Sequence, residues 1–600
     1  MGVKRSQGMR NAKNSSDYHI AYECPRSHLA DVGERTKLPI RHNRSHKRSS
    51  SFFPRTRKTD MREATLLFEL VSVAAARSTE GTALCAGREI LNYGAMALRM
   101  EAFAAGALTL GLERSDRVAV YLDKRPETVV AAFGSSAAGA AFVPVNPVLK
   151  PDQVAHILRD CNARVLVTSE ERLAPLLSLL AECPDLRHVI VAGSPFNATS
   201  HGHVAIHAWN DFADLPPRPG HRAIDTDVAA ILYTSGSTGK PKGVVLSHRN
   251  MVAGAKSVAT YLDNREDDVL LAVLPLSFDA GFSQLTTAFH AGARVVLLNY
   301  LLPRDVVNAL VRERVTGITA VPPLYIQLCQ VEWPQSISGH LRYFANTGGR
   351  MPQQTLRALR SRVPDAKPYL MYGLTEAFRS TYLPPEEVDR RPDSIGKAIP
   401  NAEILVLRED GTPCGPNEPG ELVHRGALVG LGYWNDAGKT AERYRALPGR
   451  QSGLVLPEIA VFSGDTVRMD DEGFIYFVGR HDEMIKTSGY RVSPTEIEEV
   501  FYDAGDVAEV AAFGVPHPLL GQAIVAVVTA KQAALISEAS LAESCRNRLP
   551  AYMLPAVIDI RTGPLPRNAN GKIDRRSLAS EFQHRFDVIA GSVSERTVSS

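Results

Sequence analysis

The chain has 600 residues, of which 44% are hydrophobic, so it exceeds the size that one core usually organises and predicts a globular protein of two or more domains. Its formal net charge of +3 is unevenly distributed: residues 1–60 hold fourteen Lys and Arg against five Asp and Glu, which leaves 54 basic and 60 acidic residues in the remainder. This mildly acidic body lacks the strongly basic balance of nucleic-acid-binding proteins, so we expect no nucleic-acid partner.

Seven cysteines are scattered along the chain without a C-x-x-C pair. This spacing argues against a zinc site or a disulfide framework and is typical of a protein in a reducing cytoplasm. The longest uncharged stretch, residues 128–149, contains glycines, serines and two prolines that disfavour a bilayer-spanning helix. We therefore expect a cytoplasmic protein without an integral membrane segment.

Residues 1–60 combine clustered charge at 41–48 with three consecutive serines and no apolar periodicity, which predicts a basic disordered leader. Globular patterning begins at Met61, and one hypothesis is that Met61 is the true translation start.

From residue 61 onward, apolar runs such as 118–122 and 165–167 alternate with helical stretches, which predicts α/β layers with mainly parallel sheets. Near residues 478–482 the pattern changes to a shorter α+β alternation. We accordingly expect a large N-terminal domain at residues 61–480, a small α+β domain at 481–580 and a tail at 581–600.

The most informative segment is the loop at residues 231–243, where an apolar strand leads into hydroxyl residues, glycines and lysines. Glycines let backbone amides approach an anion, hydroxyls donate hydrogen bonds to its oxygens, and lysine supplies a compact positive charge. The glycine spacing is not that of a Walker loop, and Pro241 stands where that loop has the Ser or Thr that holds magnesium. The residues predicted to bind phosphate are Thr234, Ser235, Gly236, Ser237, Thr238, Gly239 and Lys242.

Further motifs accompany this loop in a fixed order along the chain. They lie at residues 139–146, 372–376, 420–422, 463–465, 479–482, 486–491 and 570–572. With the phosphate loop they resemble, over roughly residues 65–580, the adenylate-forming superfamily of acyl-CoA synthetases, peptide-synthetase adenylation domains and luciferases. The set is also similar to stand-alone ligases of bacterial polysaccharide and exosortase-associated gene sets.

The resemblance implies a ligase that activates a carboxylic acid with ATP as an acyl adenylate, releases pyrophosphate and transfers the acyl group to a thiol. It makes Glu376 the ligand of Mg²⁺ and Thr375 a phosphate-side hydroxyl. Lys572 matches the lysine that reaches the reacting carboxylate and the α-phosphate. Asp465 is expected to accept hydrogen bonds from the ribose hydroxyls.

The resemblance also assigns the adenine side and the junction between domains. Gly348 and Gly349 would allow the backbone to approach the base, with the ring of Tyr372 stacking against it. Arg480 would meet the ribose or the α-phosphate. Asp482 would be the hinge about which a small mobile C-terminal domain rotates.

After that rotation, the loop with Lys486, Gly489 and Arg491 would face the site, and Gly489 would let a pantetheine arm pass near the backbone. Only 28 residues follow Lys572, and they contain no phosphopantetheine site. Coenzyme A is the expected thiol, with a separate holo acyl carrier protein as the alternative. The histidines nearest to the motifs are His248 and His517, and neither is identified as a thiol base.

Two residues bear on the acid. Asp279 resembles the aspartate of amino-acid-activating domains, where it would pair with a substrate ammonium; a helix N-cap is the equal alternative. Arg379 lies at a position that often lines the acyl pocket in the family, where it would bind a second substrate carboxylate. A competing hypothesis from another class is a non-catalytic protein that binds acyl groups or nucleotides.

Overall fold

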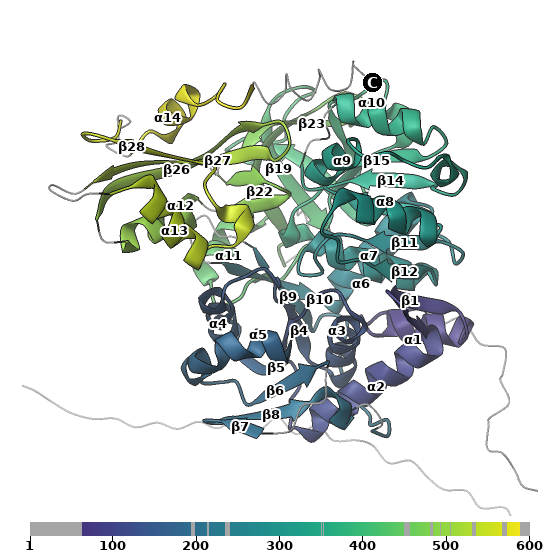
Figure 1. The fold of residues 1–600 in the computed structure, drawn as a ribbon. Helices are drawn as coiled ribbons and strands as arrows, with labels where there is room; N and C mark the ends of the chain where they lie inside the picture. Colours follow the sequence, from purple (N-terminus) through teal and green to yellow (C-terminus); the bar gives the residue numbers. More distant parts are fainter. Residues whose placement is uncertain are drawn as a thin grey trace, which may run out of the picture. The chain divides into compact units, whose positions relative to one another are not determined.

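The protein is represented by a computed structural model that describes residues 63–587 apart from 194–198, 213–214, 235–240, 350, 352, 449–455, 481–483, 493, 505, 531–535 and 567–572. The described residues form three sheets covered by helices (Figure 1). The predicted α/β fold, with a large N-terminal and a small α+β C-terminal part, is confirmed. The domain boundaries themselves stay a prediction.

The first sheet joins a parallel half to an antiparallel half. Its parallel strands run from β15 to β1, and β16 starts the antiparallel half. In spatial order the strands are β18 (Ala402–Leu407), β19 (Gly420–Gly426), β22 (Ile459–Met469), β23 (Ile475–Arg480), β17 (Ser394–Ala398), β16 (Thr381–Leu383), β15 (Lys367–Tyr372), β14 (Tyr343–Asn346), β13 (Gly317–Ala320), β11 (Val269–Ala272), β12 (Arg294–Leu297), β1 (Thr82–Ala86) and β2 (Glu89–Asn92), with β21 (Tyr444–Ala446) beside β22.

The second sheet is parallel from β9 to β8 and antiparallel at both edges. In spatial order its strands are β20 (Gly432–Tyr433), β10 (Lys242–Ser247), β9 (Val228–Thr234), β4 (Ala141–Pro144), β3 (Arg117–Tyr121), β5 (Ala163–Ser169), β6 (His188–Ala192), β8 (Val204–Ala208) and β7 (Thr199–His201).

Helices of the large part cover both sheets (Figure 1). Their bounds are α1 (Glu69–Arg77), α2 (Tyr93–Thr109), α3 (Pro126–Ala138), α4 (Pro151–Asp160), α5 (Glu170–Leu173), α6 (His248–Tyr261), α7 (Asp279–Ala291), α8 (Pro303–Arg312), α9 (Pro322–Leu328), α10 (Gln353–Arg362) and α11 (Ala437–Arg443).

Helix α7 lies in the largest hydrophobic core, where side chains of both sheets meet. Phe282 of α7 stacks on Phe142 of β4 with ring centroids 4.6 Å apart, and Phe289 packs edge-on against Phe133 of α3 at 5.2 Å. These buried aromatic pairs fix α7 because each ring removes a large apolar area from water and has a preferred geometry. The amino end of α7 is therefore held in a defined position at the predicted acyl pocket.

Local sequence explains where α6 and α7 begin and end. Ser247 and Asn250 form a reciprocal capping box at the start of α6, with the Asn250 side chain accepting from the Ser247 amide at 2.8 Å. Helix α7 ends at Gly292 because its φ of 80° lies in the left-handed region that glycine tolerates best.

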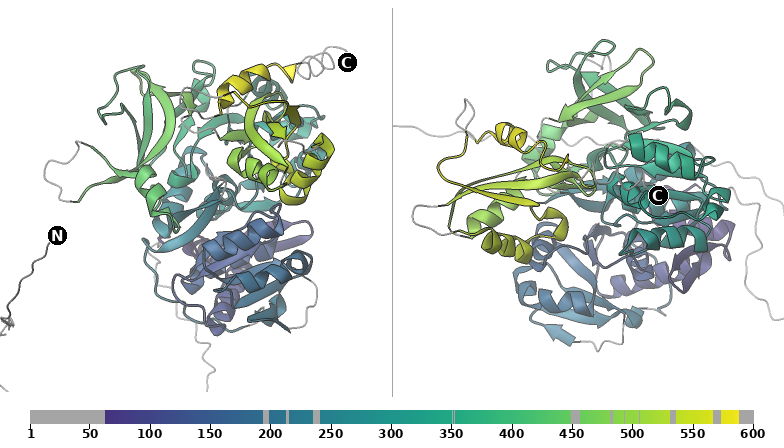
Figure 2. Two further views of the ribbon diagram at one scale, coloured as in Figure 1. Left: turned by 90° about the vertical axis from the view of Figure 1, so that its left-hand side faces the viewer. Right: turned by 45° about the horizontal axis from the view of Figure 1, so that its top comes forward.

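The C-terminal part has its own sheet, which Figure 2 shows from two further sides. Alternate residues of its long strands point to opposite faces, so α12 and α13 pack on one face and α14 on the other. Its elements are β25 (Tyr490–Val492), β24 (Ile485–Thr487), β27 (Gly521–Ala530), β26 (Val507–His517), β28 (Val557–Arg561), α12 (Pro494–Asp503), α13 (Glu538–Arg548) and α14 (Arg575–Glu581). Across the described part of the chain, every helix is too short or too polar to cross a bilayer.

Candidate active site

A cavity of about 160 Å³ lies at the carboxyl ends of β9, β14 and β15 and the amino end of α7. In α/β proteins this edge of the sheet is where ligands usually bind. The β24–β25 hairpin of the C-terminal part also contributes to its wall. Of the predicted site residues, those lining the cavity are Thr234, Asp279, Gly348, Thr375, Arg379 and Gly489.

The phosphate loop connects two antiparallel strands rather than a strand and a helix. Thr234 ends β9, Lys242 begins β10, and the two residues are paired across the ladder. A Walker loop instead leads into a helix amino terminus, so this topology agrees with the expectation from the spacing. Burial lowers the pKa of Lys242, and its Nζ lies 5.8 Å from the ring centroid of Tyr433.

Glu376 is held by the strand next to the phosphate loop. Its Oε1 accepts a hydrogen bond from the Tyr433 hydroxyl at 2.7 Å, and its carbonyl accepts from the Gly430 amide at 2.9 Å. Tyr433 lies on β20, which pairs with β10. The sheet therefore brings Glu376 and Lys242 to the same tyrosine, one at its hydroxyl and one near its ring.

A single oriented carboxylate suits magnesium, which keeps several waters and takes its other ligands from substrate phosphates. No group of three or more His, Cys, Asp and Glu side chains forms a dedicated metal cage among the residues that the structure describes. The Glu376 carboxylate, oriented by Tyr433, has the chemistry expected of a single magnesium ligand.

Asp465 and Tyr372, the residues predicted to meet the ribose and the adenine, contact each other. The Tyr372 hydroxyl donates a hydrogen bond to the Asp465 carboxylate, which is 4% exposed. The Asp465 amide donates to Ser463 Oγ at 3.0 Å, and Asp465 is the Cα partner of Arg480 on β23. A carboxylate fixed in this way is prepared to accept hydrogen bonds from a diol.

Gly348 has a φ of 75°, which favours glycine, and a Cβ at this position would lie 3.2 Å from Val321 Cγ1 and 3.8 Å from the Gly489 carbonyl oxygen. The side chain of Asn346 donates to the Gly349 carbonyl at 2.8 Å and so fixes the loop. The loop with Gly348 and Gly349 therefore lies directly beside Gly489, and Gly348 and Gly489 both line the cavity.

The thiol-side loop is the tight turn of the β24–β25 hairpin. Ser488 and Gly489 have φ values of 52° and 83°, as a type I′ turn requires. A Cβ on Gly489 would lie 2.9 Å from both methyls of Val321, so only glycine fits without displacement. Lys486 of the same hairpin places its Nζ 4.8 Å from the Phe477 ring centroid.

Tyr490, which follows this turn, contacts both parts of the chain. Its ring stacks on Tyr552 with centroids 3.5 Å apart and meets Phe278 edge-on at 4.9 Å. Burial raises the pKa of Tyr490, while a hydrogen bond with the Asn146 side chain opposes that shift. Gln153 of α4 adds a hydrogen bond to Glu496 of α12 at 2.9 Å. These contacts hold the thiol-side loop at the cavity.

Asp279 and Arg379, the residues predicted to line the acyl pocket, lie together in the wall of the cavity. Asp279 is the first residue of α7, and its Oδ1 accepts from the Ala280 amide at 2.6 Å. Its Oδ2 is 3.8 Å from Arg379 Nη1, an ion pair longer than a hydrogen bond. Burial raises the pKa of Asp279, and the charge of Arg379 opposes that shift.

Both histidines near the motifs have structural contacts. His248 Nδ1 accepts from the Leu67 amide at 3.1 Å, and burial lowers the pKa of His248 to about 4. His517 Nδ1 accepts from the amides of Leu519 and Leu520. Neither histidine lines the described cavity.

Several predicted residues lie outside the described residues or outside this cavity. Ser235 to Gly239, Asp482 and Lys572 fall among the undescribed residues, and only the backbones of Arg480 and Arg491 are described. The predicted site residues that the structure describes in full but that do not line the cavity are Lys242, Gly349, Tyr372, Glu376, Asp465 and Lys486. Sequence reasoning missed Tyr433, Tyr490 and Asn146; the last two belong to motifs that it had recognised.

Together, the fold, the carboxylates and the thiol-side hairpin are those of an adenylate-forming ligase. Comparison with known families agrees: residues 71–434 match the family described as AMP-binding enzyme, and residues 496–572 match the AMP-binding enzyme C-terminal domain. The chain belongs to the AMP-binding enzyme family, and the prediction of an acid–thiol ligase is confirmed.

The curated relatives include a ligase named for coenzyme A and a ligase named for a carrier protein. A long-chain-fatty-acid–CoA ligase of Salmonella typhimurium is 32% identical over 87% of this chain and 95% of its own length. An L-proline–[L-prolyl-carrier protein] ligase of Streptomyces coelicolor is 32% identical over 83% and 93%. The o-succinylbenzoate CoA synthetase structure from Bacillus subtilis superposes with a TM-score of 0.72 at 25% identity, covering 85% of this chain and 98% of that one.

Proposed function

We propose that this protein binds ATP with Mg²⁺, activates a carboxylic acid as its acyl adenylate and transfers the acyl group to coenzyme A. The observation that carries the proposal is one cavity lined by Thr234 and Thr375 on the phosphate side and by Gly489 of the thiol-side hairpin. Both half-reactions need the same acyl carbon, so one cavity with two kinds of wall fits a two-step ligase better than a binding protein.

In the first step, a carboxylate oxygen of the acid attacks the α-phosphorus of ATP, and the bond from that phosphorus to pyrophosphate breaks. Thr234, Lys242 and Thr375 would hold the phosphates. Glu376 would hold Mg²⁺, which when bound offsets the negative charge that separates the two anions. Lys572 is proposed to reach the α-phosphate and the reacting carboxylate.

In the second step, the thiol sulfur attacks the acyl carbon, the bond to the adenylate oxygen breaks, and AMP leaves. Gly489 would allow the pantetheine arm to pass close to the backbone, because glycine carries no side chain of its own. Asn146 and Phe278 would hold Tyr490, and therefore the loop, in place. The main work of the protein here is to orient the two groups and keep water out.

The nucleotide itself would lie between two walls. Asp465 is proposed to accept from the ribose hydroxyls and Arg480 to meet the ribose or α-phosphate. Gly348, Gly349 and Tyr372 would enclose the adenine. Asp482 is the proposed hinge, and Lys486 and Arg491 the proposed flanks of the thiol loop.

The test is ATP–pyrophosphate exchange over a panel of carboxylic acids, followed by thioester formation with coenzyme A or with a holo carrier protein. Exchange with no acid would contradict the proposal and favour a non-catalytic binding protein. Thioester formation with the carrier protein but not with coenzyme A would show that the carrier protein is the acceptor. A cytoplasmic location stays a prediction from the cysteines.

Lys572 separates the two half-reactions. Lys572→Ala should abolish pyrophosphate exchange but retain thioester formation from a supplied acyl adenylate, because in the proposed mechanism rotation of the C-terminal part at Asp482 replaces Lys572 by the loop with Gly489 before the thiol step. Lys486→Ala on the thiol-side hairpin is the matched control and should retain exchange. Equal loss of both activities in Lys572→Ala would contradict a two-arrangement mechanism, in which the C-terminal part rotates between the two half-reactions.

A further inference from the structure

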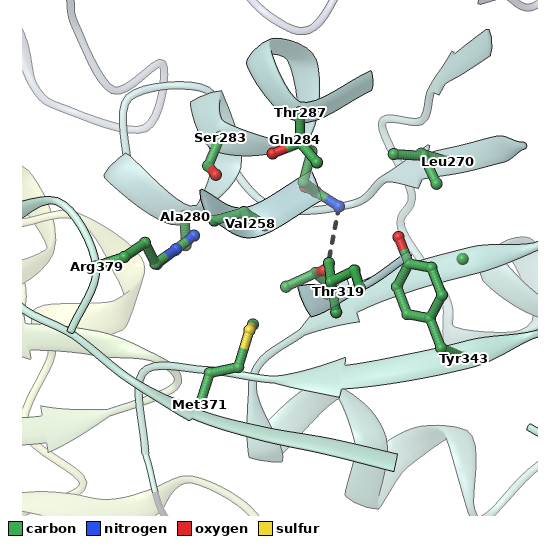
Figure 3. A pocket seen from close by; sticks show the side chains of 12 residues that line it. Val258, Leu270, Ala280, Ser283, Gln284, Thr287, Thr319, Tyr343, Met371 and Arg379 are labelled. Carbon is green, nitrogen blue, oxygen red and sulfur yellow. Dashed lines mark hydrogen bonds between the residues drawn. The ribbon is translucent and has the colours of Figure 1, made fainter. Parts of the chain in front are cut away.

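A second, smaller cavity of about 20 Å³ shares Arg379 and Ala280 with the active-site cavity. Figure 3 shows Arg379 entering from one side, opposite Tyr343 and Leu270, with the α7 side chains Ser283, Gln284 and Thr287 above it and Met371 below. This volume accommodates about one water molecule or one small polar group. The small cavity thus extends the acyl end of the site by a short distance only.

Arg379 is a buried cation with unused hydrogen-bonding capacity. It is 3% exposed, and among the described residues its one ion pair is the 3.8 Å approach to Asp279 and its Nε has no hydrogen-bond partner. A buried charged donor without an acceptor is unfavourable, since water would satisfy it outside. The missing acceptor is therefore expected to arrive with a ligand.

The turn before Arg379 keeps it pointing inward. Phe378 has a φ of 56°, an unusual value for a residue with a side chain, and is completely buried. Its ring packs on α6 so closely that a Cβ on Gly254 would lie 2.3 Å from Phe378 Cδ1. Packing thus imposes the strained turn, and strain of this kind gathers at ligand sites.

The small cavity offers further unused polar atoms. Gln284 Nε2 donates to the carbonyls of Leu271 at 2.8 Å and Thr319 at 3.4 Å, which fixes the amide so that Oε1 is the acceptor. That Oε1 and Thr287 Oγ1 are buried without hydrogen-bond partners among the described residues. An alkyl chain placed against Arg379, Gln284 and Thr287 would leave all three unsatisfied.

We propose that the natural acid is short and carries a second oxygen function, a hydroxyl, carbonyl or carboxylate, that accepts a hydrogen bond from Arg379 at the junction of the two cavities. This inference rests on the proposed ligase function and names its substrate class. Arg379 is the residue that selects the substituent, because its planar guanidinium presents several donors in fixed directions. The Arg379 charge also opposes a substrate ammonium at Asp279, only 3.8 Å away.

The experiment is ATP–pyrophosphate exchange with short straight-chain acids and their hydroxy, oxo, dicarboxylic and amino derivatives of equal length. We expect kcat/KM for the best oxygen-bearing acid to exceed that for its unsubstituted counterpart by roughly 100-fold, because a site built for a hydrogen bond rejects the analogue without it. In Arg379→Met the ratio should fall to about one. Arg390→Met, at an exposed arginine, is the matched control and should keep the ratio.

Arg379→Met leaves the Asp279 carboxylate without its counter-charge, so the double variant Asp279→Asn/Arg379→Met is measured beside it. Circular dichroism and Tm report whether each variant folds. An unchanged ratio in a folded variant would overturn the assignment of Arg379. A wild-type preference for unsubstituted or amino acids would overturn the substrate class while leaving the ligase function standing, whereas exchange with no acid would refute the ligase function itself.

Discussion

The cavity region has two groups of polar residues: a nucleotide wall with Glu376 and Asp465, and an acyl wall with Asp279 and Arg379. The two walls differ in how far their polar groups already have hydrogen-bond partners. Glu376 accepts from Tyr433, and Asp465 accepts from Tyr372, so the carboxylates that would meet magnesium and ribose are oriented before any ligand binds. Arg379, by contrast, has an Nε without a hydrogen-bond partner among the residues that the structure describes, and it lies beyond hydrogen-bond distance of Asp279. The carboxylates that would meet ATP in every turnover are thus oriented in advance. The hydrogen bonding of Arg379 would be completed only when the acid substrate binds.

This difference separates two kinds of defect. Damage to the nucleotide wall should slow activation of every acid by the same factor, because ATP is common to all of them. Damage to the acyl wall should change the ranking of acids instead.

The largest uniform effect is expected at Glu376. Glu376→Gln keeps the size of the side chain but removes the charge that would bind Mg²⁺, so kcat for pyrophosphate exchange should fall on the order of 10²- to 10³-fold with every acid. Glu442→Gln, at an exposed glutamate, is the control. A loss confined to some acids would place Glu376 on the acyl wall and would contradict the distinction between the two walls.

Asp465→Asn should follow with roughly 100-fold lower kcat/KM for ATP, mostly through a higher KM, because the neutral amide is a weaker acceptor for the ribose hydroxyls. Titrating ATP against 2′-deoxy-ATP checks the cause. In the wild type the deoxy analogue should bind more weakly, and in Asp465→Asn the two nucleotides should be nearly equivalent. A persistent difference in the variant would remove Asp465 from the ribose site.

A smaller uniform effect is expected from Tyr433→Phe, which deletes the hydroxyl that orients Glu376 while keeping the ring. We expect about a 5- to 10-fold higher Mg²⁺ concentration for half-maximal exchange, because the lost bond affects magnesium only through the orientation of Glu376 and so costs about 1 kcal/mol. Tyr444→Phe is the comparison variant, since its hydroxyl reaches the Glu376 carbonyl only at 3.4 Å. An unchanged magnesium dependence would show that Glu376 needs no such support.

The smallest effect is a pH dependence confined to the acyl wall. Burial raises the pKa of Asp279, so lowering the pH neutralises this carboxyl earlier than an exposed one and frees Arg379 for the substrate. The ratio of kcat/KM for a hydroxy acid over its unsubstituted counterpart should rise about threefold from about pH 8 to about pH 5.5. In Asp279→Asn the ratio should be flat; a fall toward low pH in the wild type would contradict this account.

The nucleotide wall was largely predictable from the sequence, because its residues stand in contiguous motifs whose order is specific. Thr234 and Thr375, which belong to two of these motifs, line one cavity, and Asp465 lies beside Tyr372. Tyr433 escaped notice because it contacts Glu376 from 57 positions away through a two-residue strand, and no local pattern marks so short an element.

The acyl wall was less predictable. Asp279 and Arg379 were both named, but their 3.8 Å approach depends on the packing of α7 and on the buried Phe378 turn. Gln284 and Thr287 look like ordinary helix residues until the core around Phe282 fixes which way α7 faces. Tertiary packing, rather than local propensity, decides these contacts.

The hydrogen bond from Gln153 to Glu496 has a consequence for how often the thiol-side loop occupies the cavity. One such bond contributes about 1 kcal/mol, which biases an equilibrium by roughly fivefold. In the proposed two-arrangement mechanism this bond would add to the contacts of Tyr490 with Phe278 and Asn146 and would favour the arrangement with the thiol-side loop at the cavity. A stronger bond here would then slow the return to adenylate formation.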